Sequence, residues 1–359
     1  AYEISLGLVG SEMCIRDRAK GLDCGTSFYI TATEDRIKKQ RNAFLTVDGE
    51  VTQVKRMLKR QGIPFVEKNK KIHIVGQHAF NYAQIFSAAE LKRPMKSGLL
   101  NPQEKDALPV LNAIIGELLG DAVGKETCVY CIPSKPIDAQ REVSYHEDVL
   151  KTIIEQYGYN VKVIEEAVAI GYEGLVDNQL TGVAISMGAG MCNIAVMYQG
   201  MTALSFSVSR GGDWIDECVA TDTGVSKAKV TNIKESSKNL DLKKSTINDI
   251  YEEGTEEANV LIAIRSYYGA LVNYLLTNLR VQFEGIDNVP NFPDPVPIVI
   301  GGGTALVTGF LDVFNEQFDQ SEFPIPVSEI VLIEDAHTAV ARGCLSEAQL
   351  AEEDEEDDS

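Results

Sequence analysis

A strand–glycine turn–strand hairpin occurs twice in this chain, and this duplication limits the folds that the chain can adopt. The first copy has a polar, glycine-bearing turn at 21–27, followed by β-forming residues at 28–31. The second has a strand at 181–186, a glycine turn at 187–190 and another strand at 193–198. A repeated supersecondary unit indicates a repeated architecture. The sequence therefore predicts two similar α/β domains.

The residues between and after the hairpins predict helices that cover parallel strands. Residues 129–133 and 161–164 have the composition of strands, and the apolar spacing of 139–157 between them is typical of a helix. Such β-α-β units build parallel sheets covered by helices. In the second half, 259–283 predicts one long helix and 298–300 a buried strand. The expected fold class is α/β with mixed sheets.

Charge and composition exclude several classes of protein. The 359 residues include 33 Lys and Arg against 53 Asp and Glu, which gives a net charge of −20. Nucleic-acid binding needs a basic surface, so no direct nucleic-acid partner is expected. No apolar run has the roughly 18 residues of a membrane-spanning helix. Seven cysteines, an odd number in a chain of this length, indicate a reducing compartment, so we expect a cytoplasmic protein.

Both ends of the chain differ from the rest. Residues 1–18 lack the basic region and the cleavage pattern of a secretory signal and resemble an adaptor-derived segment, so they are set aside as non-native. Seven acidic residues occupy 352–358. Because like charges repel and no apolar residue interrupts them, 347–359 is predicted to be a disordered acidic tail.

Three glycine turns that follow strands are the candidate ligand-binding segments. They are 23–27, 188–190 and 301–303, and the third opens a predicted helix at 304–318. Glycine lets a backbone approach a phosphate closely, and backbone amides and hydroxyls then contact the anionic oxygens. One such turn is weak evidence. Three turns after buried strands, two of them in equivalent places, predict a phosphate site.

Two acidic positions are candidates for chemistry. Asp23 follows a strand directly and could hold Mg²⁺ through water, or it could cap the turn. Glu165 and Glu166 follow the strand at 161–164, where either could orient a water molecule or simply stabilise a helix start. The chain has no Walker lysine motif, and the glycines at 301–303 do not fit the dinucleotide fingerprint. Cys128 and Cys131 are interpreted as structural thiols.

Eight segments, in this order, resemble the superfamily of actin, heat-shock chaperones and sugar kinases. The order is most similar to the bacterial actin homologue MreB. The segments are GLDCGTS (21–27), VGQHAF (75–80), CIPSKPIDAQR (131–141), VIEEAVAIGYEGL (163–175), AISMGAGMCNIAV (184–196), SRGGDWID (209–216), PIVIGGGTALVTGF (297–310) and IEDAHTAVARGCL (333–345).

The resemblance implies two RNase-H-like, actin-like domains with a nucleotide cleft between them. Domain I would span 19–180, with a small insertion at about 45–97. Domain II would span 181–346, with a helical insertion at about 221–285. The implied ligands are ATP or ADP and Mg²⁺.

The resemblance also assigns roles to residues. Asp23 would hold the metal through water, and Glu166 would position the lytic water. Ser186 would be a weak further contact to the metal. The nucleotide would be bound by Gly25, Thr26, Ser27, Gly188, Ala189, Gly190, Gly211, Gly212, Lys234, Gly301, Gly302, Gly303 and Thr304.

Three positions depart from the family pattern. Ser186 stands where the second phosphate loop normally has Asp, and a hydroxyl carries no charge to attract a metal. Ala167 replaces the proline of the first connecting segment. The glutamate of the family's ribose clamp falls on Lys229, which leaves Lys234 as the weaker remaining contact.

The implied function is that of an ATP-binding protein that polymerises into filaments, with slow ATP hydrolysis regulating assembly. Its partners would be other copies of itself and a cargo or membrane adaptor. Two alternatives remain. A non-polymerising nucleotide-binding scaffold is suggested by Ser186 and by the strong net charge, which opposes self-association at low salt. A small-molecule kinase is less favoured, because no further substrate-binding acid stands out.

Overall fold

The protein is built around two five-stranded mixed sheets. The computed structural model describes residues 19–47, 51–85, 90–236, 240–243, 254–285 and 292–357, so the segment 1–18 lies outside the described residues. The first sheet has the order β11 (Asn160–Glu165), β10 (Thr127–Ile132), β1 (Lys20–Cys24), β2 (Phe28–Ala32) and β3 (Ile37–Arg41). β1 pairs with β2 in antiparallel and with β10 in parallel fashion.

The second sheet repeats this arrangement. Its order is β14 (Met201–Val208), β13 (Cys192–Tyr198), β12 (Gly182–Met187), β15 (Val296–Gly301) and β16 (Val327–Leu332). β12 pairs with β13 in antiparallel and with β15 in parallel fashion, as β1 does with β2 and β10. The predicted fold class is therefore confirmed, and the two hairpins occupy equivalent places in the two sheets.

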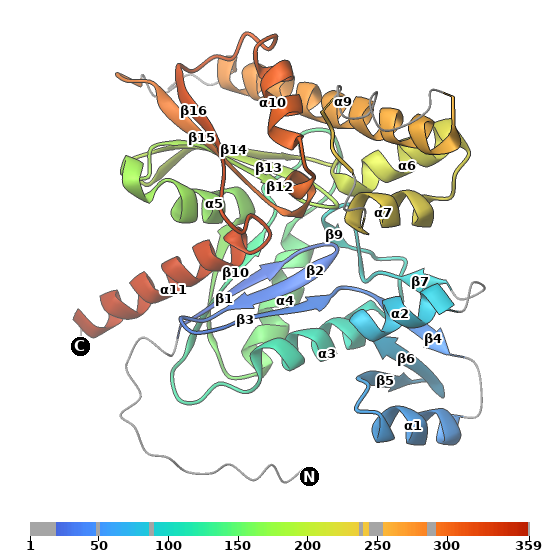
Figure 1. Ribbon diagram of the computed structural model, residues 1–359. Helices are drawn as coiled ribbons and strands as arrows, with labels where there is room; N and C mark the ends of the chain where they lie inside the picture. Colours follow the sequence, from blue (N-terminus) through green and yellow to red (C-terminus); the bar gives the residue numbers. More distant parts are fainter. Residues whose placement is uncertain are drawn as a thin grey trace.

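Two helices fill the space between the sheets. α5 (Glu166–Gly174) packs on the second sheet, α11 (Ala339–Asp357) packs on the first, and the two helices pack on each other (Figure 1). The outer face of the first sheet is covered by α3 (Ala107–Leu119) and α4 (Ser144–Gln156). The second sheet shares a core with α6 (Gly212–Thr223), α9 (Glu256–Glu284) and α10 (Phe310–Phe318).

A smaller unit with its own core leaves the first sheet after β3 (Figure 1, lower right). It contains β4 (Phe44–Val47), α1 (Val51–Arg60), β5 (Phe65–Lys68), β6 (Lys71–Val75), α2 (Gln77–Ile85) and β7 (Leu91–Lys92). Its buried residues include Leu45, Leu58, Ile72 and Ile74. A two-stranded ribbon, β8 (Met95–Lys96) and β9 (Leu99–Leu100), returns the chain to the main body.

The apolar composition of the long helix α9 is explained by its burial in the core of the second half. By length and hydropathy alone it could cross a membrane. Eleven of its residues, among them Ile264, Tyr268 and Leu275, are buried in the core of the second half, against α6 and α10. The helix was predicted at 259–283 and extends a few residues further at its N-terminal end, where the Thr255 side chain accepts a hydrogen bond from the Ala258 amide.

The expectation of a disordered tail from residue 347 is wrong for the part that the structure describes. α11 continues to Asp357, through most of the segment predicted to be disordered. Ala348 and Ala351 are buried, and the Glu352 carboxylate accepts a hydrogen bond from the Thr127 amide. These buried alanines precede the acidic run on the same helix, which packs on the first sheet, and charge counting alone did not reveal this packing.

The helix predicted at 304–318 is also divided. Residues Gly303–Leu306 form one 3₁₀ turn (η3), and α10 begins only at Phe310. Between them Gly309 has a φ of +80°, a conformation that side chains rarely adopt, and Thr308 forms an isolated bridge with Asp241. The backbone therefore turns here, where hydrophobic spacing predicted a continuous helix.

The crossing of α5 and α11 requires glycine at 343. A Cβ placed on Gly343 would lie 1.8 Å from the carbonyl oxygen of Ala169 in α5. A backbone atom cannot move aside as a flexible side chain does. The Arg342 guanidinium also donates to the Glu173 carboxylate at 2.6 Å, which fixes the two helices in register.

We predict that Gly343→Ala lowers the free energy of unfolding by about 2 kcal/mol or more, because the helices must separate. Gly269→Ala is a matched control, since Gly269 also lies inside a helix but its added Cβ would meet nothing closer than 3.6 Å. That control should gain about 0.5–1 kcal/mol from helix propensity. Urea unfolding of the ligand-free protein measures both. Equal stabilities would contradict the proposed crossing.

Candidate functional site

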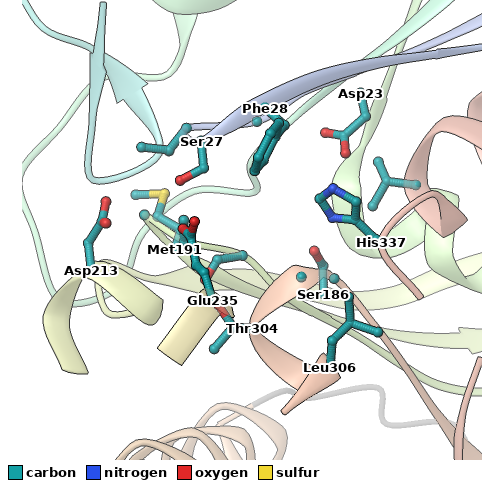
Figure 2. Close-up of a pocket in the computed structure, with 18 of the residues that line it drawn as sticks. Asp23, Ser27, Phe28, Ser186, Met191, Asp213, Glu235, Thr304, Leu306 and His337 are labelled. Carbon is teal, nitrogen blue, oxygen red and sulfur yellow. The ribbon is translucent and has the colours of Figure 1, made fainter. Parts of the chain in front are cut away.

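A cavity of about 550 Å³ lies between the two halves of the molecule and brings all three glycine turns together. Its lining includes Gly25, Thr26 and Ser27 from the first hairpin and Gly188, Ala189 and Gly190 from the second. Gly302, Gly303 and Thr304 contribute from the third turn. Figure 2 shows Asp23, Ser186, Thr304 and His337 around the opening, on elements from both sheets. Sequence spacing predicted this convergence.

The two hairpin tips touch each other within the cavity. Thr26 Oγ1 accepts a hydrogen bond from the Gly98 amide at 3.1 Å. A Cβ on Gly190 would lie 2.4 Å from this same oxygen and 2.3 Å from the Gly98 nitrogen. Gly190 is therefore required for the close approach of the second hairpin to the first. The backbone amides of both turns lie next to a common space, which is the arrangement that binds a polyphosphate.

Asp23 and Glu166 form a carboxylate pair at the base of the cavity. Asp23 lies at the end of β1, and Glu166 is the first residue of α5. Burial raises the pKa of Asp23 to about 7, although a hydrogen bond from the Cys131 thiol partly opposes the shift. Burial also raises the pKa of Glu166 to about 8, with a further contribution from the charge of Asp23. No cation among the described residues contributes to either pKa.

This donor set fits a divalent cation. Two desolvated carboxylates without a positive partner repel each other, and carboxylate and hydroxyl oxygens are the ligands that Mg²⁺ prefers. Ser186 is buried at the end of β12, and its hydroxyl donates to Glu166 Oε2 at 3.4 Å. Its oxygen therefore lies beside the pair, where a carboxylate would have added a third negative charge.

Asn193 fixes the position of Glu166 and was not identified from the sequence. Its side-chain amide donates to Glu166 Oε2 at 2.9 Å, and its carbonyl oxygen accepts from the Ser134 amide at 3.1 Å. Asn193 is fully buried on β13, directly opposite Ser186 in the sheet register. The only signal in the sequence was a polar residue at an inward position of a buried strand.

Of four further predicted nucleotide-binding residues, three glycines lie behind the cavity wall and one lysine forms part of it. Gly301 is buried at the end of β15 against Ile170 and does not line the cavity. Gly211 and Gly212 begin α6 and also lie behind the lining, where the Gly212 amide donates to the Gly188 carbonyl. Lys234 does line the cavity. These glycines support the second hairpin by allowing close packing.

The wall opposite the first hairpin is formed by α7 (Lys227–Ser236). Lys234 makes a buried ion pair with Asp216 at 2.7 Å and donates to the Gly212 carbonyl. Lys229 points away from the cavity and pairs with Glu256 instead. Glu235 lines the cavity, one residue beyond Lys234. The carboxylate that α7 presents to the cavity is therefore that of Glu235, a position that the family motif did not indicate.

Two ion pairs cross between the halves beside the cavity. Arg41 of β3 meets Glu235 of α7 at 3.0 Å, and its guanidinium lies over the rings of Phe28 and Phe80. Arg93 forms a two-oxygen pair with Asp213 of α6, at 2.9 and 2.8 Å. Because these partners are far apart in the sequence, no motif indicated either pair.

His337, Phe28 and Lys39 also line the cavity and were not predicted. The rings of Phe28 and His337 meet edge to face, with centroids 5.2 Å apart, and so connect β2 with the segment before α11. Burial lowers the pKa of His337 to about 4, so this histidine is neutral at physiological pH. The Nζ atom of Lys39 lies over the face of the Phe28 ring, 4.6 Å from the ring centroid.

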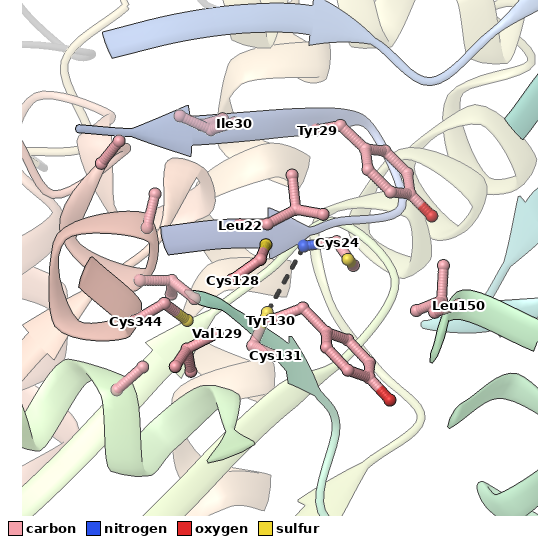
Figure 3. Packing of buried hydrophobic residues seen from close by; sticks show 14 of the residues in the cluster. Leu22, Cys24, Tyr29, Ile30, Cys128, Val129, Tyr130, Cys131, Leu150 and Cys344 are labelled. Carbon is pink, nitrogen blue, oxygen red and sulfur yellow. Dashed lines mark hydrogen bonds between the residues drawn. The ribbon is translucent and has the colours of Figure 1, made fainter. Parts of the chain in front are cut away.

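Four buried cysteines surround the base of the first hairpin: Cys24, Cys128, Cys131 and Cys344 (Figure 3). The Cys131 sulfur accepts a hydrogen bond from the Cys24 amide at 3.4 Å, and the Cys131 thiol donates to Asp23. Burial raises the pKa of each of the first three thiols, which keeps them protonated. No cluster of three or more potential metal ligands from His, Cys, Asp and Glu occurs in the described residues. These contacts agree with a structural role for Cys128 and Cys131.

Solved structures with the same fold include filament proteins. The chain is 15% identical to a protein described as "MamK double helical filament", over 93% of this chain and 98% of that one, with a TM-score of 0.58. It is 16% identical to MreB5 of Spiroplasma citri bound to AMPPNP, over 95% and 98%, with a TM-score of 0.62. These likenesses establish an actin-like fold of two domains, as the sequence predicted. No curated protein sequence matches the chain.

A family profile matches nearly the whole chain. The profile of the family described as Volactin covers residues 18–348, which include both hairpins, the third glycine turn and most of α11. The match begins at residue 18, the last residue of the segment 1–18 that the sequence set apart. The chain belongs to the volactin family of actin-like proteins.

Proposed function

We propose that this protein binds ATP in the cavity between its two halves and polymerises into filaments, with slow ATP hydrolysis regulating assembly. One observation carries the proposal: glycine turns from both sheets meet at a common space beside a desolvated carboxylate pair. The size of this space, about 550 Å³, suits a nucleotide. The free cysteines of the first sheet agree with a reducing, cytoplasmic location.

The polyphosphate would lie between the tips of the two hairpins. The backbone amides of 25–27 and 188–190 would donate to phosphate oxygens. The base and ribose would extend towards Gly302–Leu306, with Glu235 and His337 on either side. The structures of MreB5 from Spiroplasma citri described as bound to AMPPNP and to ADP, which share this fold, support a nucleotide as the ligand.

Asp23 and Glu166 would carry the acidic roles in phosphate hydrolysis. A magnesium ion bound beside Asp23 and Ser186 would neutralise charge on the transferred phosphoryl group. Glu166, whose Oε2 accepts hydrogen bonds from both the Asn193 amide and the Ser186 hydroxyl, would orient the attacking water. Its raised pKa makes the ionised form of Glu166 a stronger base than an ordinary carboxylate.

Assembly would respond to the nucleotide because the ligand contacts both halves at once. The close approach of Gly190 to Thr26 and the ion pairs Arg41–Glu235 and Arg93–Asp213 connect the halves around the cavity. A nucleotide that binds one arrangement of these contacts more tightly shifts the population towards it. The filament of MamK, which shares this fold, supports polymerisation as the output. The net charge of −20 implies that assembly needs salt to screen repulsion.

The alternative is a nucleotide-binding scaffold that does not polymerise. Ser186 favours it, because a hydroxyl holds a metal more weakly than the carboxylate expected there. Polymerisation and hydrolysis distinguish the two functions.

We expect filaments in negative-stain electron micrographs of residues 19–359 with MgATP at high salt, and single particles with EDTA and no nucleotide. Sedimentation of the same samples measures the polymerised fraction. Uniform single particles under every condition, together with measurable ATP binding, would favour the scaffold.

Glu166→Gln should preserve nucleotide binding and slow phosphate release by roughly tenfold or more, because the amide cannot accept the proton of the attacking water. Glu165→Gln is the matched control, as the adjacent acid does not line the cavity. Binding of a fluorescent ATP analogue and a phosphate-release assay separate the two properties. Unchanged turnover in Glu166→Gln would refute the water-positioning role.

The carboxylate pair predicts a pH dependence of stability in the ligand-free protein. Because folding raises both pKa values, from 3.8 to about 7 and from 4.5 to about 8, the folded state binds protons more tightly. This contribution is complete below pH 4 and is lost as pH rises through 7 and 8. The double variant Asp23→Asn/Glu166→Gln should therefore become increasingly more stable than wild type between pH 5 and 8. Thermal unfolding tests this, and a pH-independent difference would contradict it.

A further inference from the structure

The cavity has more negative than positive side chains, although its proposed ligand is an anion. Five carboxylates line it: Asp23, Glu166, Asp213, Asp216 and Glu235. Three cations face them: Lys39, Arg41 and Lys234. A triphosphate that enters such a space needs positive charge, because Coulomb repulsion is strong where water is partly excluded.

Most of these charges are already paired within the protein. Lys234 is committed to Asp216 at 2.7 Å, and Arg41 to Glu235 at 3.0 Å. Asp213 is neutralised by Arg93, which does not line the cavity. Among the lining residues that the structure describes, Lys39 is the cation that has no carboxylate within 4.0 Å. Its ammonium group lies over the face of the Phe28 ring.

The sheet register places Lys39 close to the phosphate loops. Lys39 lies opposite Ile30 in the pairing of β2 with β3, and Ile30 lies opposite Asp23 in the pairing of β1 with β2. The three side chains therefore form one row across the sheet and line the same cavity. Ile30, at the centre of this row, is apolar, so the positive charge in the row is that of Lys39 on β3.

The surroundings of Lys39 hold its ammonium group near the cavity and leave it accessible. The side chain is exposed to the solvent of the opening and lies over Phe28, which itself contacts His337. Burial of part of the stem and the nearby Arg41 lower the pKa of Lys39, and the charge of Glu235 partly opposes this shift. A bound anion would give the Lys39 ammonium group a counter-charge, and no existing ion pair of Lys39 would have to break.

We infer that Lys39 of β3 is a phosphate-binding residue that contacts the polyphosphate of the bound nucleotide directly. Its positive charge would add to that of the metal, which Ser186 holds more weakly than a carboxylate would. This assignment rests on the proposed function, since it names a residue that binds the same ligand. Arg41 has a different role, because its pairing with Glu235 holds the two halves together beside the site.

The test compares Lys39→Met with Lys38→Met. Lys38 is the neighbouring residue on β3, loses the same charge, and donates to the carbonyl of Leu118 away from the cavity. Isothermal titration calorimetry measures the affinities of adenosine, ADP, ATP and pyrophosphate, each in Mg²⁺ and in EDTA. Lys39→Met should weaken ADP, ATP and pyrophosphate by roughly tenfold and leave adenosine unchanged, as expected for one charge-assisted contact.

Two further comparisons distinguish a phosphate contact from a damaged cavity. Lys39→Arg keeps the charge and should bind ADP within about threefold of wild type, whereas Lys38→Met should bind it like wild type. The loss in Lys39→Met should be at least as large in EDTA as in Mg²⁺, because a side-chain cation acts without the metal. Equal ADP affinities of wild type and Lys39→Met, or an equal loss of adenosine binding, would overturn the inference.

The outcomes also separate this inference from the proposed function. If wild type binds ATP and Lys39→Met binds it equally well, nucleotide binding stands and the role of Lys39 fails. If wild type binds pyrophosphate in a Lys39-dependent manner but does not prefer ATP or ADP over it, the anion site stands and the nucleotide proposal fails. Absence of binding of all four ligands to wild type would refute both.

Discussion

The close approach of two backbones at glycine positions is the constraint on which the rest of this structure depends. Gly343 lets α11 lie against α5, and Gly190 lets the second hairpin reach the first. At both places a single methyl group would occupy the position of a backbone atom or a hydroxyl. The halves can therefore share a cavity only because these contacts have no side chain between them. The site's geometry follows from packing at these two contacts.

The same approach excludes water from acidic groups and so determines the electrostatics of the cavity. Asp23 and Glu166 come from the end of a strand and the start of a helix, and among the described residues no cation contributes to the pKa of either. Asn193 and Ser186 hold Glu166 by neutral hydrogen bonds, which orient it without cancelling its charge. The remaining acids are matched by Arg41, Arg93 and Lys234 across or beside the cavity. What remains unbalanced is the carboxylate pair and Lys39, a combination suited to a metal with a phosphate.

Much of the fold followed from the order of hydrophobic segments and glycine turns. The two hairpins, the crossover to β11 and the long helix α9 all appear where periodicity and turn residues predicted them. The prediction failed at 304–318, where Gly309 interrupts a helical pattern, and at 347–357, where alanines pack an acidic helix onto the first sheet. Both errors arose because hydrophobic spacing and net charge are averages over a segment. The first segment is interrupted by a single turn at Gly309, and the second is held by the buried methyl groups of Ala348 and Ala351.

For the site, the sequence by itself identified the candidates that a local motif marks: Asp23, Glu166 and the glycines of the turns, which follow strands of both sheets. The tertiary structure decided the rest. Asn193, Glu235, Arg41 and Lys39 act through partners on other strands and helices, and a motif cannot encode such pairings. It also decided that Gly211, Gly212 and Gly301 support the wall of the cavity from behind. A residue's type is written in the chain, but its neighbours, its loss of water and hence its charge depend on which segments fold against it.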